Sequence, residues 1–118
     1  RKKYGNLEQV EIIAADIMTL VSTRKYAAVV CCNCFPHIEM KNSFLWRMKE
    51  FLEPTGKLVI MHDIPRDRVN AIHSASETVK DDRLVKAQIL SEWMRALGYE
   101  ILSEQDNDKW YFVCGENT

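Results

Sequence analysis

The chain has 118 residues, which is a common size for a single domain. Its hydrophobic content of 47% is enough to build a core, and 16 basic against 17 acidic side chains leave a net charge of −1. This balance gives no electrostatic reason to expect a nucleic-acid or anionic-membrane partner. No apolar run reaches the roughly 20 residues that are needed to span a bilayer.

Three apolar runs of strand length come first, and each ends on polar side chains. They are predicted as strands over about 10–16, 26–33 and 57–62, ending at Asp16, at Asn33 and at His62. In a parallel sheet the carboxyl ends of the strands share one edge, where α/β proteins bind their ligands. We therefore expect an acid, an amide and imidazole groups to gather along one rim.

The remaining elements are three helices and a terminal hairpin. The first helix is predicted over 42–53, where apolar residues recur on one face. The second begins near Pro65, which suits the first turn of a helix, and runs to about 75. The third covers 84–97 and ends at Gly98. Two strands, 99–103 and 110–114, are joined by a turn-rich segment. The order predicts an α/β fold, a Rossmann-like three-layer αβα sandwich with a mostly parallel sheet and a C-terminal antiparallel hairpin.

Three of the four cysteines, Cys31, Cys32 and Cys34, crowd at the end of the second predicted strand. Adjacent cysteines on a strand point to opposite faces and pair poorly, so we expect reduced thiols and a cytoplasmic protein. Only Cys32 and Cys34 would share a strand face. We therefore interpret these cysteines as core residues rather than as a metal site, and we expect no metal.

All three histidines, His37, His62 and His73, fall at predicted strand ends or on the helix just beyond. Imidazole titrates near neutral pH, so these side chains are candidates for proton transfer or for binding a polar substrate. Arg66, Asn70, His73 and Glu77 are spaced to form one stripe along the predicted helix. The alternative is an ordinary solvated helix face.

Several local sequences, taken in order, resemble the C-terminal two-thirds of class I S-adenosylmethionine-dependent methyltransferases. The segment 10–16 resembles the family's strand and acid near the cofactor's adenine, and 26–34 resembles the central strand that closes the cofactor pocket. Residues 35–38 resemble the loop after that strand. The stretch FLEPTGKLVI at 51–60 resembles the family's vLkPGGklvi segment, and residues 62–73 resemble an H-x-x-x-R-x-x-x-N-x-x-H pattern of one subgroup.

The family's glycine-rich cofactor loop has no counterpart, because Gly5 is the only glycine before Gly56. The strand whose acid binds the ribose in the family is also lacking. We expect 1–118 to be a single domain and the C-terminal part of a larger methyltransferase domain. Without the two strands that the family places beside it, the second predicted strand would have an open edge. We expect that edge to pair with another chain or a swapped strand, or residues 1–20 to be disordered.

The resemblance implies S-adenosylmethionine as cofactor and methyl transfer to a small or medium-sized substrate, with the missing part supplied by the full-length protein. It places residues in three groups: Asp16, Ile17, Cys32, Asn33 and Cys34 at the cofactor; His37 and His62 in catalysis; Phe35, Arg66, Asn70 and His73 at the substrate. For Asp16 a helix cap or a solvated loop acid is an open alternative, and Asn33 could instead satisfy loop backbone. The alternative function is a non-catalytic Rossmann-like module that self-associates, as a possible homo-oligomer, through its exposed sheet edge.

Overall fold

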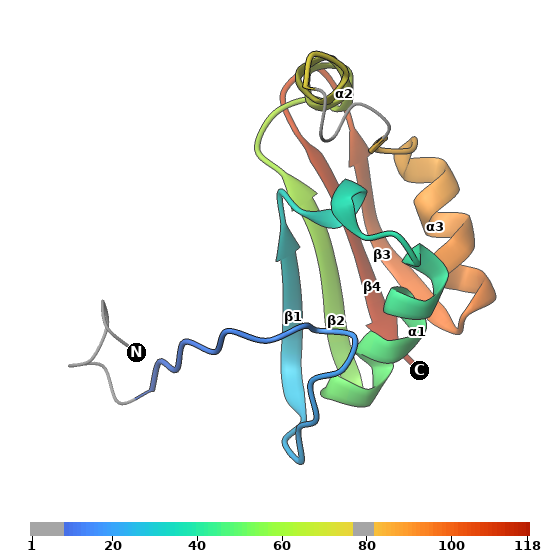
Figure 1. Cartoon of the computed structure of the whole chain (residues 1–118). Helices are drawn as coiled ribbons and strands as arrows, with labels where there is room; N and C mark the ends of the chain where they lie inside the picture. The colour runs from blue at the N-terminus through green and yellow to red at the C-terminus, as the bar shows by residue number, and fades with distance from the viewer. Residues whose placement is uncertain (1–8, 77–81) are drawn as a thin grey trace.

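The computed structural model describes residues 9–76 and 82–118. Within them, each of the first two strands is followed by two helical elements, and a pair of strands comes last (Figure 1). The elements are β1 (Tyr26–Cys32), the 3-10 helix η1 (Phe35–His37), α1 (Lys41–Phe51), β2 (Leu52–His62), α2 (Arg66–Ser74), α3 (Ala87–Ala96), β3 (Tyr99–Asp106) and β4 (Tyr111–Asn117). The predicted helices, the hairpin and the second and third predicted strands are confirmed, with shifted ends.

The four described strands form one sheet in the order β1-β2-β4-β3. Only β1 and β2 run parallel, whereas β2 pairs with β4 and β4 pairs with β3 in antiparallel fashion. The prediction of a mostly parallel sheet is therefore wrong. Its cause is twofold: the hairpin contributes two of the three pairings, and the first predicted strand does not form.

Residues 9–25 contain no strand, so the strand predicted over 10–16 is wrong. The apolar side chains of this run are exposed, Ile12 at 52% and Ile13 at 57%. A strand needs a partner, and the nine residues that lead to β1 are short for a parallel crossover, which takes a dozen or more. The segment instead passes over the helix-bearing side of β1, where the Arg47 guanidinium donates to the carbonyls of Ile17 and Leu20.

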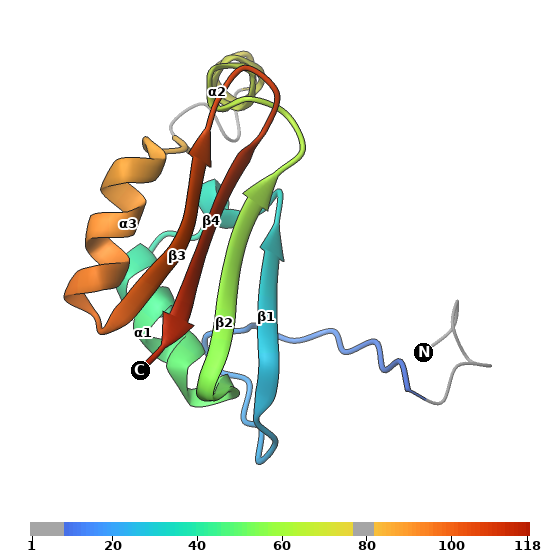
Figure 2. The ribbon, with the colours of Figure 1, turned by 180° about the vertical axis from the view of Figure 1, so that it is seen from behind.

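Helices α1 and α3 cover one face of the sheet, and among the described residues no helix covers the other (Figures 1 and 2). The described structure is thus a two-layer sandwich, and the three-layer prediction does not hold for these residues. Alternation along β2 accounts for the division, since Leu58, Ile60 and His62 are buried under the helices while Val59 and Met61 face the other way and are half-buried.

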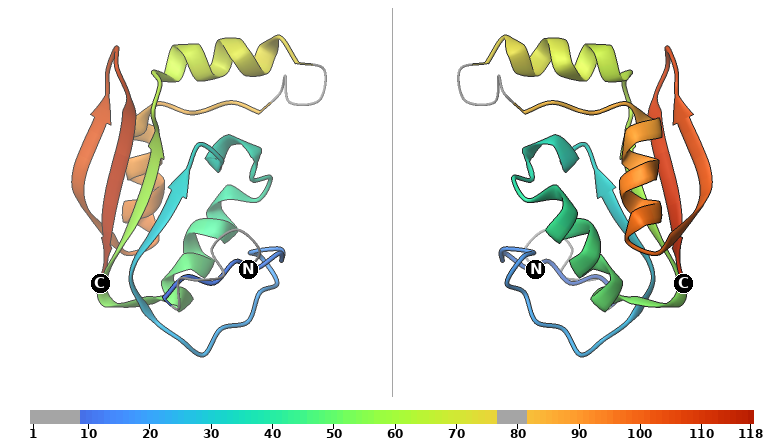
Figure 3. Two further views of the ribbon diagram at one scale, coloured as in Figure 1. Left: turned by 90° about the vertical axis from the view of Figure 1, so that its left-hand side faces the viewer. Right: turned by 90° about the vertical axis from the view of Figure 1, so that its right-hand side faces the viewer.

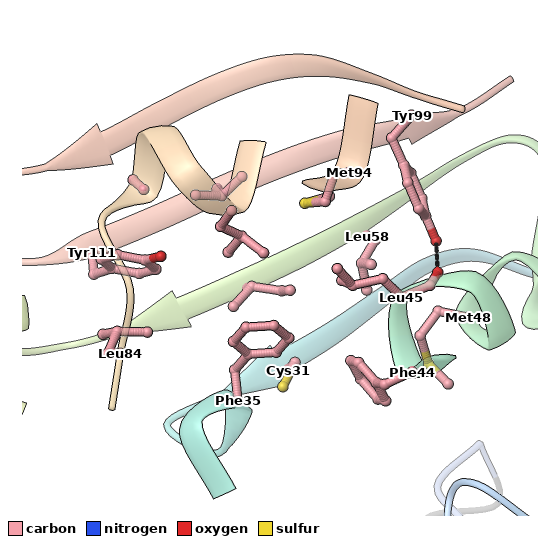
Figure 4. Close-up of a cluster of buried hydrophobic side chains, with 14 of the residues drawn as sticks. Cys31, Phe35, Phe44, Leu45, Met48, Leu58, Leu84, Met94, Tyr99 and Tyr111 are labelled. Atoms are coloured by element: carbon pink, nitrogen blue, oxygen red, sulfur yellow. Dashed lines mark hydrogen bonds between the residues drawn. The ribbon is translucent and has the colours of Figure 1, made fainter. Parts of the chain in front are cut away.

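The core lies between the sheet and these two helices (Figure 4). Tyr99 is 3% exposed, and its hydroxyl donates to the Leu45 carbonyl oxygen at 2.7 Å, joining β3 to α1. Gly115 lets α3 approach β4 closely, because a Cβ there would lie 2.5 Å from the Met94 Cε. Burial of these side chains between the layers is the main stabilising contribution to the fold.

Helix α2 lies apart from this layer, across the end of the sheet (Figure 3). It begins after Pro65, as the sequence predicts, and it follows directly on the carboxyl end of β2. Gly98, with a φ of 94°, ends α3 in the left-handed conformation that favours glycine. The position of α2 brings its side chains to the rim where β1 and β2 end.

Candidate functional site

The carboxyl ends of β1 and β2 lie side by side, since the two strands are parallel and Cys32 pairs with Met61. Asn33 follows β1 with a φ of 57°, a left-handed conformation that asparagine tolerates better than most residues. Its backbone N–H donates to the Met61 carbonyl oxygen at 2.9 Å, and its Oδ1 accepts from the Asp63 N–H at 3.3 Å. Asn33 therefore ties the two strand ends together and fixes the start of the rim.

His62 is the most unusual side chain on this rim. It is 3% exposed, its ring centroid lies 6.0 Å from that of Tyr111 in an edge-on arrangement, and its Nε2 has no hydrogen-bond partner among the described residues. Burial lowers the pKa of His62 below its usual value, His73 and His37 lower it further, and Asp63 partly opposes them. The imidazole is thus neutral at pH 7 and has an unused polar atom, which is rare for a buried group.

His37 and His73 lie against each other, with ring centroids 4.6 Å apart. The Asp82 carboxylate accepts from His37 Nδ1 at 2.8 Å, and the Asp82 backbone carbonyl accepts from His73 Nδ1 at 2.8 Å. Because both acceptors require a proton on Nδ1, each neutral ring carries its lone pair on Nε2. For His37, which is partly exposed, this arrangement is that of an oriented general base.

Two pockets open on this rim and share His62 and Asp63. One, of about 130 Å³, lies between the strand ends and α2 and includes Asn33 and His73. The other, of about 330 Å³, is lined by Gln105, Trp110 and other residues where the β3–β4 hairpin meets the end of β2. The buried imidazole of His62 therefore stands between two hollows of the rim.

The other residues predicted for the substrate side have partners inside the protein. Phe35 is fully buried in the core beside Phe44. Arg66 donates through Nε to Asp106 at 3.0 Å. The Asn70 side-chain amide makes two hydrogen bonds with the backbone of Leu84: it donates to the carbonyl and accepts from the N–H. Asn70 and His73 therefore hold the segment that follows residue 81, and Arg66 holds the end of β3. Glu77 lies outside the described residues.

The cysteines are arranged differently from the sequence-based expectation. Cys32 and Cys34 are exposed, but the sulfur close to Cys34 belongs to buried Cys31, at 2.9 Å. The expectation that only Cys32 and Cys34 share a face is therefore wrong. The physical reason is that the left-handed Asn33 interrupts the strand alternation before Cys34 is reached.

Asp16 and Ile17 do not lie on this rim. The Asp16 carboxylate accepts a hydrogen bond from the Met18 N–H at 2.9 Å, and the Asp16 backbone carbonyl accepts from the N–H groups of Thr19 and Leu20. Asp16 is therefore the cap of a local turn. Ile17 lines a separate pocket with Met48 and Phe51, beside the start of β1. The expected gathering along one rim is confirmed for the Asn33 amide and for the imidazoles. It is wrong for the acid, Asp16, because the strand predicted to end there does not form.

Sequence reasoning missed Asp82, which lies in a polar segment with no pattern to mark it. Trp110, which the sequence marked only as part of a strand, is 45% exposed and lines the larger pocket. Among the described residues, no cluster of histidine, cysteine, aspartate and glutamate could hold a metal ion. Within the same part of the chain, no helix is both long and apolar enough to cross a membrane.

No protein-family model and no curated protein sequence matches this chain, but solved structures match its fold. A methyltransferase from Thermotoga maritima, described as S-adenosylmethionine-dependent and as a possible histamine N-methyltransferase, aligns with 92% of this chain and 65% of its own at a TM-score of 0.69 and 15% identity. The N-methyltransferase NodS from Bradyrhizobium japonicum, in complex with S-adenosyl-L-homocysteine, aligns with 89% of this chain and 53% of its own, with a TM-score of 0.62 and 11% identity. The [4+2]-cyclase SpnF aligns with 89% of this chain and 54% of its own, with a TM-score of 0.65 and 14% identity.

The likeness shows the fold. This chain has the architecture of class I methyltransferases, as its local sequences predict, and it spans about half to two-thirds of the length of these three structures. A fold does not determine its reaction, as the presence of a cyclase among the matches shows. The activity must therefore be argued from the rim.

Proposed function

We propose that this chain contributes the rim of β1 and β2 to an enzyme that transfers a methyl group from S-adenosylmethionine to a small or medium-sized substrate. The observation that carries the proposal is buried His62, which lines one pocket with Asn33 and His73 at the carboxyl end of two parallel strands and whose Nε2 has no partner among the described residues. In open α/β sheets this is the edge where ligands bind. The likeness to methyltransferase structures supports the choice of cofactor.

The described rim fits one wall of such a site. Its smaller pocket, about 130 Å³, is below the 300–1,000 Å³ typical of sites that enclose a whole ligand of this size. The described glycines, Gly56, Gly98 and Gly115, lie away from the rim, so no glycine-rich loop is present in this part of the chain. The neighbouring pocket of about 330 Å³, which shares His62 and Asp63, just reaches that range, so the two hollows together would offer the described part of the site.

In the proposed site the backbone around Asn33 and Cys34 would lie against the cofactor, whose sulfonium supplies an electrophilic methyl group. His37, oriented by the Asp82 carboxylate, would accept a proton from the attacking group of the substrate through Nε2. Neutral His62 would donate or accept one hydrogen bond from its buried position. Their main contribution is to hold the two reactants in line.

The test is a titration of the isotope-labelled protein with S-adenosylhomocysteine, followed by two-dimensional nuclear magnetic resonance, which detects even millimolar binding. We expect backbone signals of Asn33, Cys34 and Asp63 to shift, and those of Asp16 to stay in place. The matched variants are His62→Leu at the rim and Asp16→Asn away from it; only the first should weaken binding. Absence of any shift, or shifts confined to the turn at Asp16, would contradict the proposal.

A second function rests on a different observation. β1 is an edge strand of the described sheet, and Val30 on its uncovered face is 58% exposed. Such an edge can pair with a second copy, which would make the chain a non-catalytic module that self-associates. Sedimentation velocity distinguishes the two functions, since a dimer that persists at low micromolar concentration without binding S-adenosylhomocysteine supports the module.

A further inference from the structure

The sulfur atoms of Cys31 and Cys34 lie 2.9 Å apart at the point where the chain leaves β1. We propose that these two residues form a reversible disulfide, so that the rim carries an oxidisable C-x-x-C pair. The proposal goes beyond methyl transfer and does not require it.

The two cysteines differ in what can reach them. Cys31 is 5% exposed and belongs to the hydrophobic core, whereas Cys34 is exposed. Burial raises the pKa of Cys31, and its hydrogen bond to Cys34 raises it further, so Cys31 remains a thiol at neutral pH. Cys34 is therefore the sulfur that a dissolved oxidant meets first, with Cys31 held in contact behind it.

The oxidant that we assign is a small disulfide of the glutathione type. The Cys34 thiolate attacks one of its sulfurs, releasing one small thiolate and leaving a mixed disulfide on Cys34. Cys31 then gives up its proton and attacks the Cys34 sulfur, which releases the second small thiol. Two protein thiols are oxidised to one disulfide, and the small disulfide is reduced to two thiols.

The local backbone makes this pairing possible. On a continuing strand, residues three apart point to opposite faces, but the left-handed Asn33 breaks the alternation and brings Cys34 to Cys31. Asn33 also ties β1 to β2, so a disulfide that spans it would stiffen the part of the rim that faces the pocket. Cys32, which is exposed and points to the uncovered face of the sheet, offers a matched control.

The experiment exposes the reduced protein to oxidised glutathione, alkylates the remaining thiols and counts them by mass spectrometry. We expect the wild-type protein to lose two of its four free thiols without gaining glutathione, and dithiothreitol to restore all four. Cys32→Ser should form the same disulfide, now assignable within the tryptic peptide 26–41. Cys34→Ser should keep its remaining thiols or gain glutathione, but should form no internal disulfide.

The proposal is overturned if the wild-type protein keeps four thiols, or if it stops at glutathione adducts. It is also overturned if Cys34→Ser forms an internal disulfide as readily as Cys32→Ser. These readouts count thiols only, so they stand or fall independently of S-adenosylhomocysteine binding.

Discussion

Replacing His62 by leucine tests whether the rim carries a buried imidazole that is kept neutral at a cost in stability. The side chain is 3% exposed and its Nε2 is unpartnered. A buried polar atom without a partner costs about 1–3 kcal/mol, and leucine has a similar volume without that atom. At pH 7.5 we therefore expect His62→Leu to be as stable as the wild type or more stable, by up to about 2 kcal/mol.

The pH dependence gives the sharper result. In the unfolded chain His62 binds a proton near its ordinary pKa of 6.5, whereas burial lowers the pKa in the folded state. Below pH 6.5 the unfolded chain thus holds more protons at this residue, so His62 makes the wild type less stable as the pH falls. The advantage of His62→Leu should grow on acidification from pH 7.5 to 5.5, by at most about 1.4 kcal/mol per pH unit.

The assay is urea unfolding followed by tryptophan fluorescence at both pH values. Ile60→Ala is the control, because Ile60 is fully buried on the same face of β2 and does not titrate. It should lose about 2–5 kcal/mol with a difference from wild type that does not vary with pH. A constant difference between His62→Leu and wild type across this range would refute the reasoning, since His62 would then titrate alike in both states.

Two further predictions concern the core. Tyr99→Phe removes the hydroxyl that donates to Leu45, and it should lower the free energy of unfolding by about 1–1.5 kcal/mol. The control Tyr26→Phe, at an exposed position, should change it by less than about 0.5 kcal/mol. Equal losses for the two variants in urea unfolding would contradict this prediction. Gly115→Ala places a Cβ 2.5 Å from the Met94 Cε, which can move aside, and 3.2 Å from the less mobile Tyr99 Cβ, and should cost about 1 kcal/mol. An unchanged thermal midpoint would show that this layer has spare room.

The sequence predicted the elements whose signals are local. The apolar runs of β1 and β2, the spacing of α1 and α3 and the glycine that ends α3 all act within a few residues, and all were placed correctly within a few positions. The meeting of an amide and imidazole groups at one rim also followed, because the ends of parallel strands share an edge.

What the sequence could not predict depends on partners distant in the chain. Residues 10–16 have a strand-like apolar pattern, but a strand exists only where another can pair with it. The order β2-β4-β3 depends on how the hairpin docks, which no local pattern encodes. Asp82 acquires its role only because η1 and α2 each bring a histidine to it.

The most direct test of the proposed cofactor wall is photochemical cross-linking of S-adenosylmethionine labelled in its methyl group, followed by mapping of the tryptic peptides. The account predicts label in the peptides 26–41 and 58–66, which carry the ends of β1 and β2. Label found only in the segment that contains Asp16 and Ile17, or no label that unlabelled S-adenosylhomocysteine displaces, would contradict it.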